Sequence, residues 1–328
     1  MILNRKLLTK VSILAIAALM ISAFVVTVPM SSEASYNDGG SGTEADPYII
    51  KTIEELQAMN DDLSAHYELG GFILAEGEAF TPIGNETHPF TGSFDGSGYL
   101  ILNVSISSTE DYVGLFGHVG ADAVIKEVGL EMINVTAEDN AKVGGLVGHN
   151  SGTISESFVT GLVGGNESVG GLVGWNEGVI INCFSLAVVG GYDTVGGLVG
   201  WNGGEVNRTY AAGEVINYSN GGGLIGMDVG GDVVASYYDN ETTNLTVSDG
   251  GYGRNTTEMM NETTFVDWDF EDVWRINEGE SYPRLKALLT LGDIEDVIKG
   301  ILDDVCNSAG VILFIGGVAI VSSRRKKA

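Results

Sequence analysis

One glycine-rich octet recurs at a fixed interval in the middle of the chain. VGGLVGHN occupies residues 143–150, and VGGLVGWN follows at 169–176 and again at 195–202, so that successive copies begin 26 residues apart. A related octet, GGGLIGMD, begins at residue 221 with the same spacing. A unit of this length cannot bury a core alone, so a fixed period predicts that neighbouring units stack and share one interior.

Aligning the copies places apolar residues in three columns. The first column holds Leu146, Leu172, Leu198 and Leu224, the second Ile154, Ile180 and Val206, and the third Val163, Val189 and Val215. Glycine and asparagine, which tolerate the backbone angles of tight turns, separate the columns. The pattern predicts a parallel β structure whose coils lie about 4.8 Å apart and present three inward faces.

Two more columns and one cysteine fit the same frame. Phe158, Phe184, Tyr210 and Tyr237 align as an aromatic ladder, and Asn150, Asn176, Asn202 and Asp228 align as a polar ladder at a turn. Cys183 aligns with Ser157 and Thr209, which favours a small packed side chain over a catalytic nucleophile. The only other cysteine, Cys306, is distant in sequence, so no disulfide framework is expected.

The tetrapeptides of the repeat carry a family resemblance. GLFG at residue 114, GLVG at 145, 171 and 197, and GLIG at 223 resemble the GLUG motif of bacterial and archaeal surface proteins, which also occurs beside the catalytic region of some IgA-cleaving metallopeptidases. The resemblance covers about residues 112–239. It implies an all-β fold, a right-handed parallel β-helix of filamentous-haemagglutinin or pectate-lyase type.

A solenoid must cover its two ends. Thr52 to Glu55 form a capping box that opens a short helix, TIEELQAMN, expected to belong to the N-terminal cap. Residues 66–110 are expected to supply the first two coils. At the far end, a set of large apolar side chains is expected to close the last coil: Trp268, Phe270, Trp274, Tyr282 and Leu285.

Both chain ends resemble membrane-handling segments. Basic residues precede an apolar run at 11–28, and small residues at 32–34 suit a signal peptidase, although an uncleaved anchor is the alternative. Residues 309–321 are apolar and are followed by Arg324 to Lys327, which predicts a transmembrane helix with a cytoplasmic tail; a buried core helix is the alternative. Residues 292–306 have helical amphipathic spacing, and there the alternative is a helix continuing into the membrane.

These inferences divide the chain into seven parts. We expect a signal peptide at 1–34, an N-terminal cap with the first coils at 35–111, the GLUG repeat β-helix at 112–239, closing coils at 240–291, an amphipathic juxtamembrane helix at 292–307, a transmembrane helix at 308–323 and a basic tail at 324–328. The β-helix is therefore expected outside the cell.

The charge of the chain excludes some partners. The formal net charge is −28, and it becomes −34 between the predicted signal and the basic tail. Such a field repels nucleic acid and anionic lipid and attracts divalent cations without specificity. No Asp-x-Asp-x-Asp-Gly loop is present, so a solvated surface suited to a salty medium is at least as good an interpretation as a calcium site. We expect no cofactor.

Sites for N-glycosylation are frequent. Ten asparagines begin an Asn-x-Ser/Thr sequence without proline: Asn85, Asn103, Asn134, Asn166, Asn207, Asn217, Asn240, Asn244, Asn255 and Asn261. This density predicts a surface glycoprotein and favours an archaeal source.

Motifs for catalysis are not found in the sequence. The repeated GGxxG is not GxGxxG, the four histidines form no HExxH, and no GxSxG is present. A polysaccharide lyase or glycosidase on a β-helix is the alternative, but a lyase needs cations to neutralise a uronate, and the central region is poor in Arg and Lys. We therefore expect no catalytic residues.

The remaining interpretation is a membrane-tethered cell-surface β-helix acting in adhesion or envelope structure. Its partners would be cell-surface glycans or envelope proteins. Trp175 and Trp201 share one column and are the candidate ligand contacts; packing against a neighbouring turn is the equal alternative for both.

Overall fold

The computed structural model describes residues 39–75, 79–137, 141–217, 219–288, 290, 314–315 and 318–319. Contacts divide the chain into a large unit, Ala34–Leu289, and a second unit made of Met1–Glu33 with Thr290–Ala328. In the second unit the structure describes Thr290 and two short strands, β32 (Phe314–Ile315) and β33 (Val318–Ala319), which pair antiparallel.

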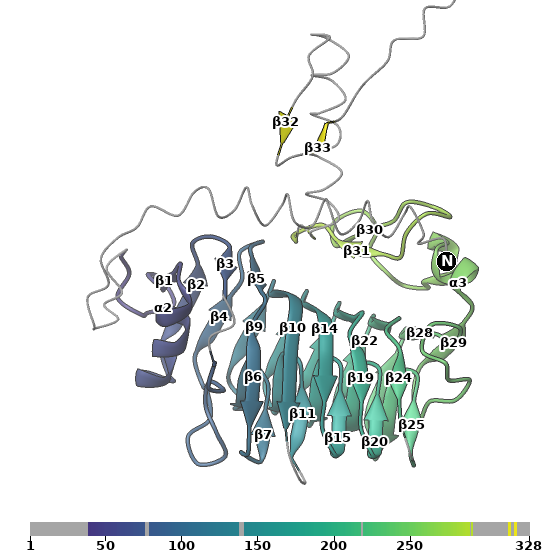
Figure 1. The fold of residues 1–328 in the computed structure, drawn as a ribbon, viewed down its shortest axis with the longest axis horizontal. Coiled ribbons are helices and arrows are strands. Elements are labelled where there is room, and N and C mark those ends of the chain that lie inside the picture. The colour runs from purple at the N-terminus through teal and green to yellow at the C-terminus, as the bar shows by residue number, and fades with distance from the viewer. Residues whose placement is uncertain are drawn as a thin grey trace, which may run out of the picture. The chain divides into compact units, whose positions relative to one another are not determined.

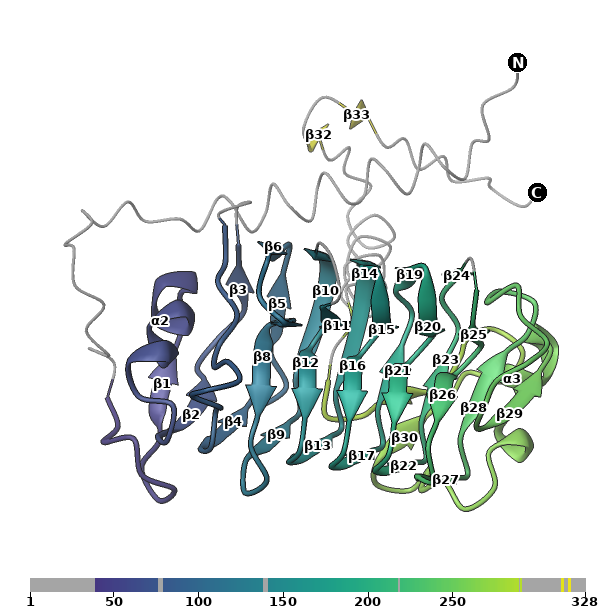
Figure 2. The same ribbon diagram turned by 90° about the horizontal axis from the view of Figure 1, so that it is seen from below.

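The large unit is a parallel β-solenoid of right-handed type, as the repeat predicted (Figure 1). The strands of its coils form four sheets, and every described pair within these four sheets is parallel. Figure 2 shows the coils side by side, with successive strands of each sheet following one another along the solenoid axis.

An eight-stranded sheet contains β1 (Tyr48–Ile50), β2 (His66–Leu69), β4 (Ser93–Asp95), β9 (Val124–Lys126), β13 (Thr153–Ser155), β17 (Val179–Ile181), β22 (Glu205–Asn207) and β27 (Asp232–Val234). An eleven-stranded sheet contains β3 (Ile73–Leu74), β5 (Leu100–Leu102), β6 (Ser105–Ser108), β10 (Gly129–Ala137), β14 (Phe158–Gly164), β18 (Phe184–Ser185), β19 (Val188–Gly190), β23 (Tyr210–Ala211), β24 (Val215–Ile216), β28 (Tyr237–Asp239) and β29 (Tyr252–Arg254).

Two five-stranded sheets complete each coil. The β7 sheet contains β7 (Tyr112–Val113), β11 (Lys142–Gly144), β15 (Glu167–Gly170), β20 (Asp193–Gly196) and β25 (Gly221–Gly222). The β8 sheet contains β8 (Phe116–Val119), β12 (Val147–Asn150), β16 (Val173–Asn176), β21 (Val199–Asn202) and β26 (Ile225–Asp228).

The columns predicted from the sequence are confirmed. The four leucines of the first column are fully buried in one hydrophobic interior, and the other two columns are in register across neighbouring strands. The asparagine ladder is buried as well, with Asn150 Nδ2 donating to Asn176 Oδ1 at 2.8 Å and Asn176 Nδ2 to Asn202 Oδ1 at 2.9 Å. Each asparagine side chain therefore donates a hydrogen bond to the amide oxygen of the next coil, so these buried polar groups have partners.

The prediction of three inward faces is wrong, because each coil visits four sheets. The octet at 143–150 supplies two strands, β11 and β12, rather than one. Glycines at 144 and 148 let these strands turn and lie so close that a side chain would not fit between them: a Cβ on Gly144 would lie 2.1 Å from Val147 O. Val143 and Val147 then both reach the core.

In five successive coils, a residue in the left-handed backbone conformation turns the chain between the eight-stranded and eleven-stranded sheets. These residues all have φ between 45° and 53°: Glu127, Glu156, Asn182, Arg208 and Ala235. The N–H groups of the first four donate to the coil that follows, as from Glu156 N to Ile181 O at 3.1 Å. Because asparagine is the only one of these residues that tolerates this conformation well, the sequence carried little signal for the corner.

Glu156 offers a test of this corner. Burial and the neighbouring Glu127 raise the pKa of Glu156 above its ordinary value of 4.5. A raised folded-state pKa stabilises the protein below the unfolded pKa, and that contribution is lost as pH rises through the folded pKa. We expect Glu156→Gln to raise the melting temperature at pH 7 and to lose this advantage below pH 4.5.

Thermal melts of both proteins across that pH range, monitored by circular dichroism, measure this effect. The exposed Glu44→Gln is the control and should behave as the unaltered chain. An equal gain at acid and neutral pH would contradict the assigned cause.

The predicted N-terminal cap is present. Helix α2 (Ile53–Gln57) begins with the expected capping box, in which Thr52 and Glu55 exchange side-chain to backbone hydrogen bonds. The helix η1 (Ala58–Asp61) continues it. Leu56 and Met59 are fully buried against the first coils, so the helix covers the end of the interior.

The aromatic ladder lies outside the interior. Phe158, Phe184 and Tyr210 stack with ring centroids 4.8 and 4.9 Å apart, yet they are absent from the core cluster that contains their neighbours Val159 and Ala211. They occupy the outer face of the eleven-stranded sheet and are nevertheless buried. Another part of the chain must therefore cover them.

The cover is residues 265–288, which we call the strap. The expectation that this segment closes the last coil is wrong, because it runs back along the outer face of the sheet (Figure 1). Trp274 lies 6.2 Å from both Phe184 and Tyr210 by ring centroids, and Tyr210 Oη donates to Pro283 O at 2.8 Å. Strands β30 (Trp274–Arg275) and β31 (Arg284–Leu285) pair within it.

Other residues close the C-terminal end. Val247 O accepts from Gly223 N at 2.9 Å, and Ser248 Oγ accepts from Leu224 N and Ile225 N, so this loop occupies the edges of the last strands. Helices α3 (Thr256–Met259) and η2 (Glu262–Thr264) follow it. These hydrogen bonds satisfy the strand edges, and Leu245 of the same segment packs against the interior.

The predicted signal peptide and juxtamembrane helix lie outside the described residues. In the predicted transmembrane segment, only the four residues of β32 and β33 are described, and they form strands rather than a helix. Within the described residues, no helix combines the length and apolar character that crossing a bilayer requires.

Candidate functional site

An aromatic stripe crosses the solenoid on the β8 sheet. Register places His118 beside His149, His149 beside Trp175 and Trp175 beside Trp201. These four side chains are half-buried, and Tyr112 of the adjoining β7 sheet packs against its histidine end. His118, His149, Trp175 and Trp201 occupy four successive coils because the repeat returns the chain to the same position each time, and Tyr112 lies in the coil of His118.

The histidines of the stripe form a stacked pair. Their ring centroids are 4.5 Å apart with an angle of 6°, and the Tyr112 ring meets both of them edge-on at 5.4 and 5.0 Å. Burial lowers the pKa of His118, and burial together with His118 lowers the pKa of His149. Both rings therefore favour the neutral form, which suits stacking better than two adjacent cations.

The candidate pair Trp175 and Trp201 is also stacked, with ring centroids 3.9 Å apart. Each indole therefore covers one face of the other. Trp201 additionally lies against the next turn, because a Cβ added to Gly203 would fall 2.7 Å from its ring. Packing thus accounts for part of both side chains, while their half-exposed parts stay available to a ligand.

Charged side chains flank the stripe. Lys142 Nζ lies 5.5 Å from the Tyr112 ring centroid and 5.9 Å from that of Trp175, within the range of a cation–π contact. Glu177 Oε2 lies 3.2 Å from His149 Nε2. The stripe therefore combines apolar rings with one cation and one carboxylate.

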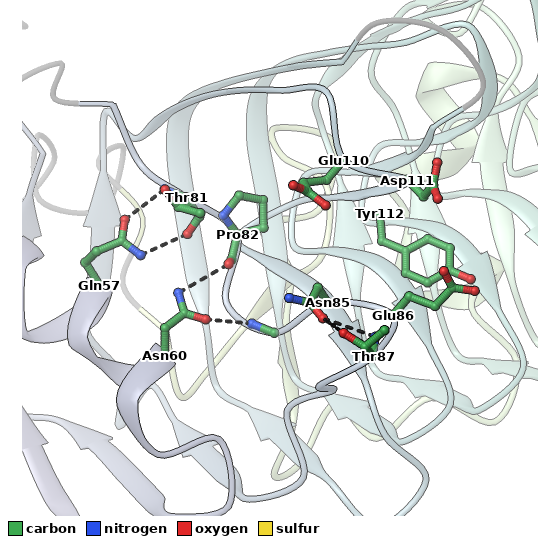
Figure 3. Close-up of a pocket in the computed structure, with 11 residues that line it drawn as sticks. Gln57, Asn60, Thr81, Pro82, Asn85, Glu86, Thr87, Glu110, Asp111 and Tyr112 are labelled. Carbon is green, nitrogen blue, oxygen red and sulfur yellow. Dashed lines mark hydrogen bonds between the residues drawn. The ribbon is translucent and has the colours of Figure 1, made fainter.

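A cavity of about 570 Å³ opens at the Tyr112 end of the stripe (Figure 3). Its walls come from η1 and α2, from the loop at 81–87 and from the segment that leads into β7: Gln57, Asn60, Thr81, Pro82, Gly84, Asn85, Glu86, Thr87, Glu110, Asp111 and Tyr112. Burial, followed by the charges of Glu86 and Asp111, raises the pKa of Tyr112.

The structure places Cys183 as predicted, in line with Ser157 and Thr209 at an interior corner. It is fully buried, and burial raises the pKa of its thiol to about 12. A thiolate nucleophile is therefore not available there at neutral pH. Across the described ranges, no three His, Cys, Asp or Glu side chains gather closely enough to hold a metal ion.

The ten sequons differ in exposure. Six of their asparagines are exposed: Asn85, Asn103, Asn134, Asn166, Asn244 and Asn261. The other four are partly buried: Asn207, Asn217, Asn240 and Asn255. Asn255 Oδ1 also caps α3 by accepting from Glu258 N at 2.9 Å. The exposed six are thus the more accessible acceptors.

Sequence reasoning missed the stripe's histidine end and the cavity. His118, His149, Trp175 and Trp201 share one position of the octet, so the alignment could have joined them. Tyr112 and Lys142 precede the first valine of their copies and were equally visible. The cavity had no sequence signal, because its walls meet only through contacts between α2, η1 and a distant loop.

Comparisons with known proteins agree with this architecture. Residues 165–189 match the family model described as the GLUG motif, which confirms the repeat. Halomucin of Haloquadratum walsbyi is 33% identical over 146 residues, which are 39% of this chain and 2% of that protein. A "putative Gly-rich membrane protein" of Evansella cellulosilytica is 32% identical over 133 residues, or 38% and 15%. The chain thus spans a small part of both relatives.

A solved structure shares the fold. It is named a "putative immunoglobulin A1 protease" from Bacteroides ovatus, and it superposes with a TM-score of 0.56 at 19% identity over 76% of this chain and 94% of that one. At this identity the likeness concerns the architecture alone.

Proposed function

We propose that this GLUG-repeat solenoid is a membrane-tethered, cell-surface protein that acts in adhesion or in the structure of the cell envelope, without catalysis. The observation that carries the proposal is the aromatic stripe, a half-buried band of rings on an otherwise acidic solenoid. Contiguous aromatic surface of this kind is typical of ligand-contact sites. The two relatives named for a mucin and a membrane protein support a surface location.

N-glycosylation and membrane anchoring are part of the same proposal. The six exposed sequons would carry N-linked glycans, and the apolar segment at 308–323 would hold the chain at the membrane. The acidic surface would keep such a protein soluble in salty surroundings and would attract divalent cations only loosely.

A polysaccharide lyase or glycosidase is the alternative from another class. β-elimination from a uronate requires cations beside the carboxylate, whereas three carboxylates and no cationic side chain line the cavity. Incubating the full chain with acidic polysaccharides and measuring unsaturated product separates the two. Turnover there would overturn the proposal.

The stripe is tested by Trp175→Ala combined with Trp201→Ala in the full chain, solubilised in mild detergent. We expect binding to glycan-coated surfaces or whole cells to weaken about tenfold or more, because buried aromatic contacts dominate such interfaces. Loss of the stacked pair should cost only about 1 kcal/mol of stability beyond lost burial. Circular dichroism and a surface binding assay measure both.

Tyr192→Ala is the matched control, since that ring is 60% exposed and lies outside the stripe. It should leave attachment unchanged. If the double variant still attaches, or if its measured loss is one of fold rather than of attachment, the stripe does not serve as the contact.

A further inference from the structure

We propose that the cavity at the Tyr112 end of the stripe binds one or two sugar units of a neutral, hydroxyl-rich glycan. The inference deepens the proposed adhesive function and rests on it. It names a site and a class of ligand that the tryptophan pair alone does not define.

The cavity is held open by specific contacts. Gln57 exchanges two hydrogen bonds with Thr81, from Nε2 to Thr81 O at 3.0 Å and from Thr81 N to Oε1 at 2.8 Å. Asn60 does the same for the next residues, donating to Pro82 O at 3.3 Å and accepting from Gly84 N at 3.0 Å. The loop at 81–87 is thus fixed to the N-terminal cap before any ligand arrives, which lowers the entropy cost of binding.

The size of the cavity suits a small saccharide. Ligand pockets usually measure about 300–1,000 Å³, and a volume of about 570 Å³ lies within that range. The lining is mixed, with one aromatic ring, a proline and several polar groups, as expected for a ligand that has both C–H faces and hydroxyl edges.

The polar groups select the ligand's charge. Among the described residues, Glu86, Glu110 and Asp111 take part in no ion pair, so their carboxylate oxygens are available to accept hydrogen bonds from sugar hydroxyls. Such charge-assisted bonds are stronger than neutral ones. The same carboxylates would repel a uronate or a sulfated sugar, which restricts the ligand to neutral glycans.

The Tyr112 ring supplies the apolar wall. His118 and His149 hold it from one side by edge-to-face contacts, so its orientation is set by the stripe. The indoles of Trp175 and Trp201, in contrast, cover one another. Tyr112 is therefore better placed than either tryptophan to pack against the C–H face of a sugar, and the stripe beyond it would contact further units of the same glycan.

Two sources could supply this sugar. One is a glycan on another molecule, and the other is an N-linked glycan on Asn85, whose side chain lines the cavity. Asn85 Oδ1 accepts from Thr87 N, Thr87 Oγ1 and His88 N, a turn that leaves the amide nitrogen without a bond among the described residues. Both sources share one chemistry, and the experiment separates them.

The full chain is made in a host without N-glycosylation and solubilised in detergent. Binding of a neutral mannose oligosaccharide, a galacturonate oligosaccharide and a lysine-rich peptide is compared by calorimetry and saturation-transfer NMR. We expect binding of the mannose oligosaccharide alone. Tyr112→Ala and, separately, Glu110→Gln combined with Asp111→Asn should each weaken it about tenfold or more, whereas Tyr192→Ala should not.

The outcomes are distinct. Failure of the neutral sugar to bind, binding of the peptide in its place, or a Tyr112→Ala variant that folds and binds normally would each overturn the inference. If cells still attach through Trp175 and Trp201 in those cases, the proposed function stands without it. If Tyr112→Ala does not fold, binding by the Glu110→Gln and Asp111→Asn double variant tests the inference, and normal binding by that variant would overturn it.

A second arm uses protein from a glycosylating host. If the glycan on Asn85 fills the cavity, external sugar should bind about tenfold more weakly to that protein, and Asn85→Asp, which keeps the Oδ1 acceptor, should restore binding. Equal binding by both preparations assigns the cavity to external glycans.

Discussion

Replacing Gly174 with alanine is expected to destabilise the solenoid by about 3 kcal/mol, at the upper end of what overpacking usually costs. Gly174 lies in β16, where the β8 sheet meets the β7 sheet. A Cβ there would fall 2.5 Å from Val143 N and 2.8 Å from Gly148 O, and both are backbone atoms of the preceding coil. Relief would therefore require moving two strands, and the same clash is repeated in each coil that carries the octet.

Gly190 provides the matched control. It lies in β19, in another sheet of the same coil, and a Cβ added there would meet nothing within 4 Å. Gly190→Ala should be neutral or stabilise by about 0.5 kcal/mol through the unfolded chain. Urea unfolding followed by circular dichroism measures both variants. Equal effects at the two positions would mean that glycine serves backbone freedom in general and not the close approach of the two sheets.

Replacing Trp274 with alanine is expected to cost about 3–5 kcal/mol, the usual range for a buried tryptophan. The ring is fully buried between the strap and the aromatic ladder, with Trp268 at 4.3 Å and Phe184 at 6.2 Å by ring centroids. The loss should fall on the strap first, because side-chain contacts around Trp274 hold the strap to the outer face, whereas parallel backbone ladders hold the coils to one another. We expect it to detach while the coils stay wound.

Limited proteolysis and dye binding distinguish this from global unfolding. The variant should be cut within residues 265–288 and should bind a hydrophobic dye through the exposed ladder, while its far-ultraviolet circular dichroism is retained. Phe270→Ala is the control in the same segment, since this ring is only half-buried and should cost less. Loss of the β signal together with the cleavage would show that the strap and the coils unfold as one unit.

The 26-residue period was enough to predict most of the solenoid. Because every coil repeats the same residue types, a column such as Leu146, Leu172 and Leu198 identifies the interior without knowledge of any long-range contact. The capping box at Thr52 was equally local, since both partners lie within four residues. For the candidate site, the register of Trp175 and Trp201 followed from the repeat, whereas their stacking on one another did not.

The sequence by itself determined which residues face the interior, which repeat positions stack and where the N-terminal helix begins, because these depend on periodicity and on neighbours along the chain. The tertiary structure alone decided that each coil has four sides, that the aromatic ladder faces outward, that the strap covers it and that η1 and α2 enclose a cavity with Tyr112. The reason is physical: a buried aromatic column has the same composition on either face of a sheet, and only the return of a distant segment removes the outer face from water.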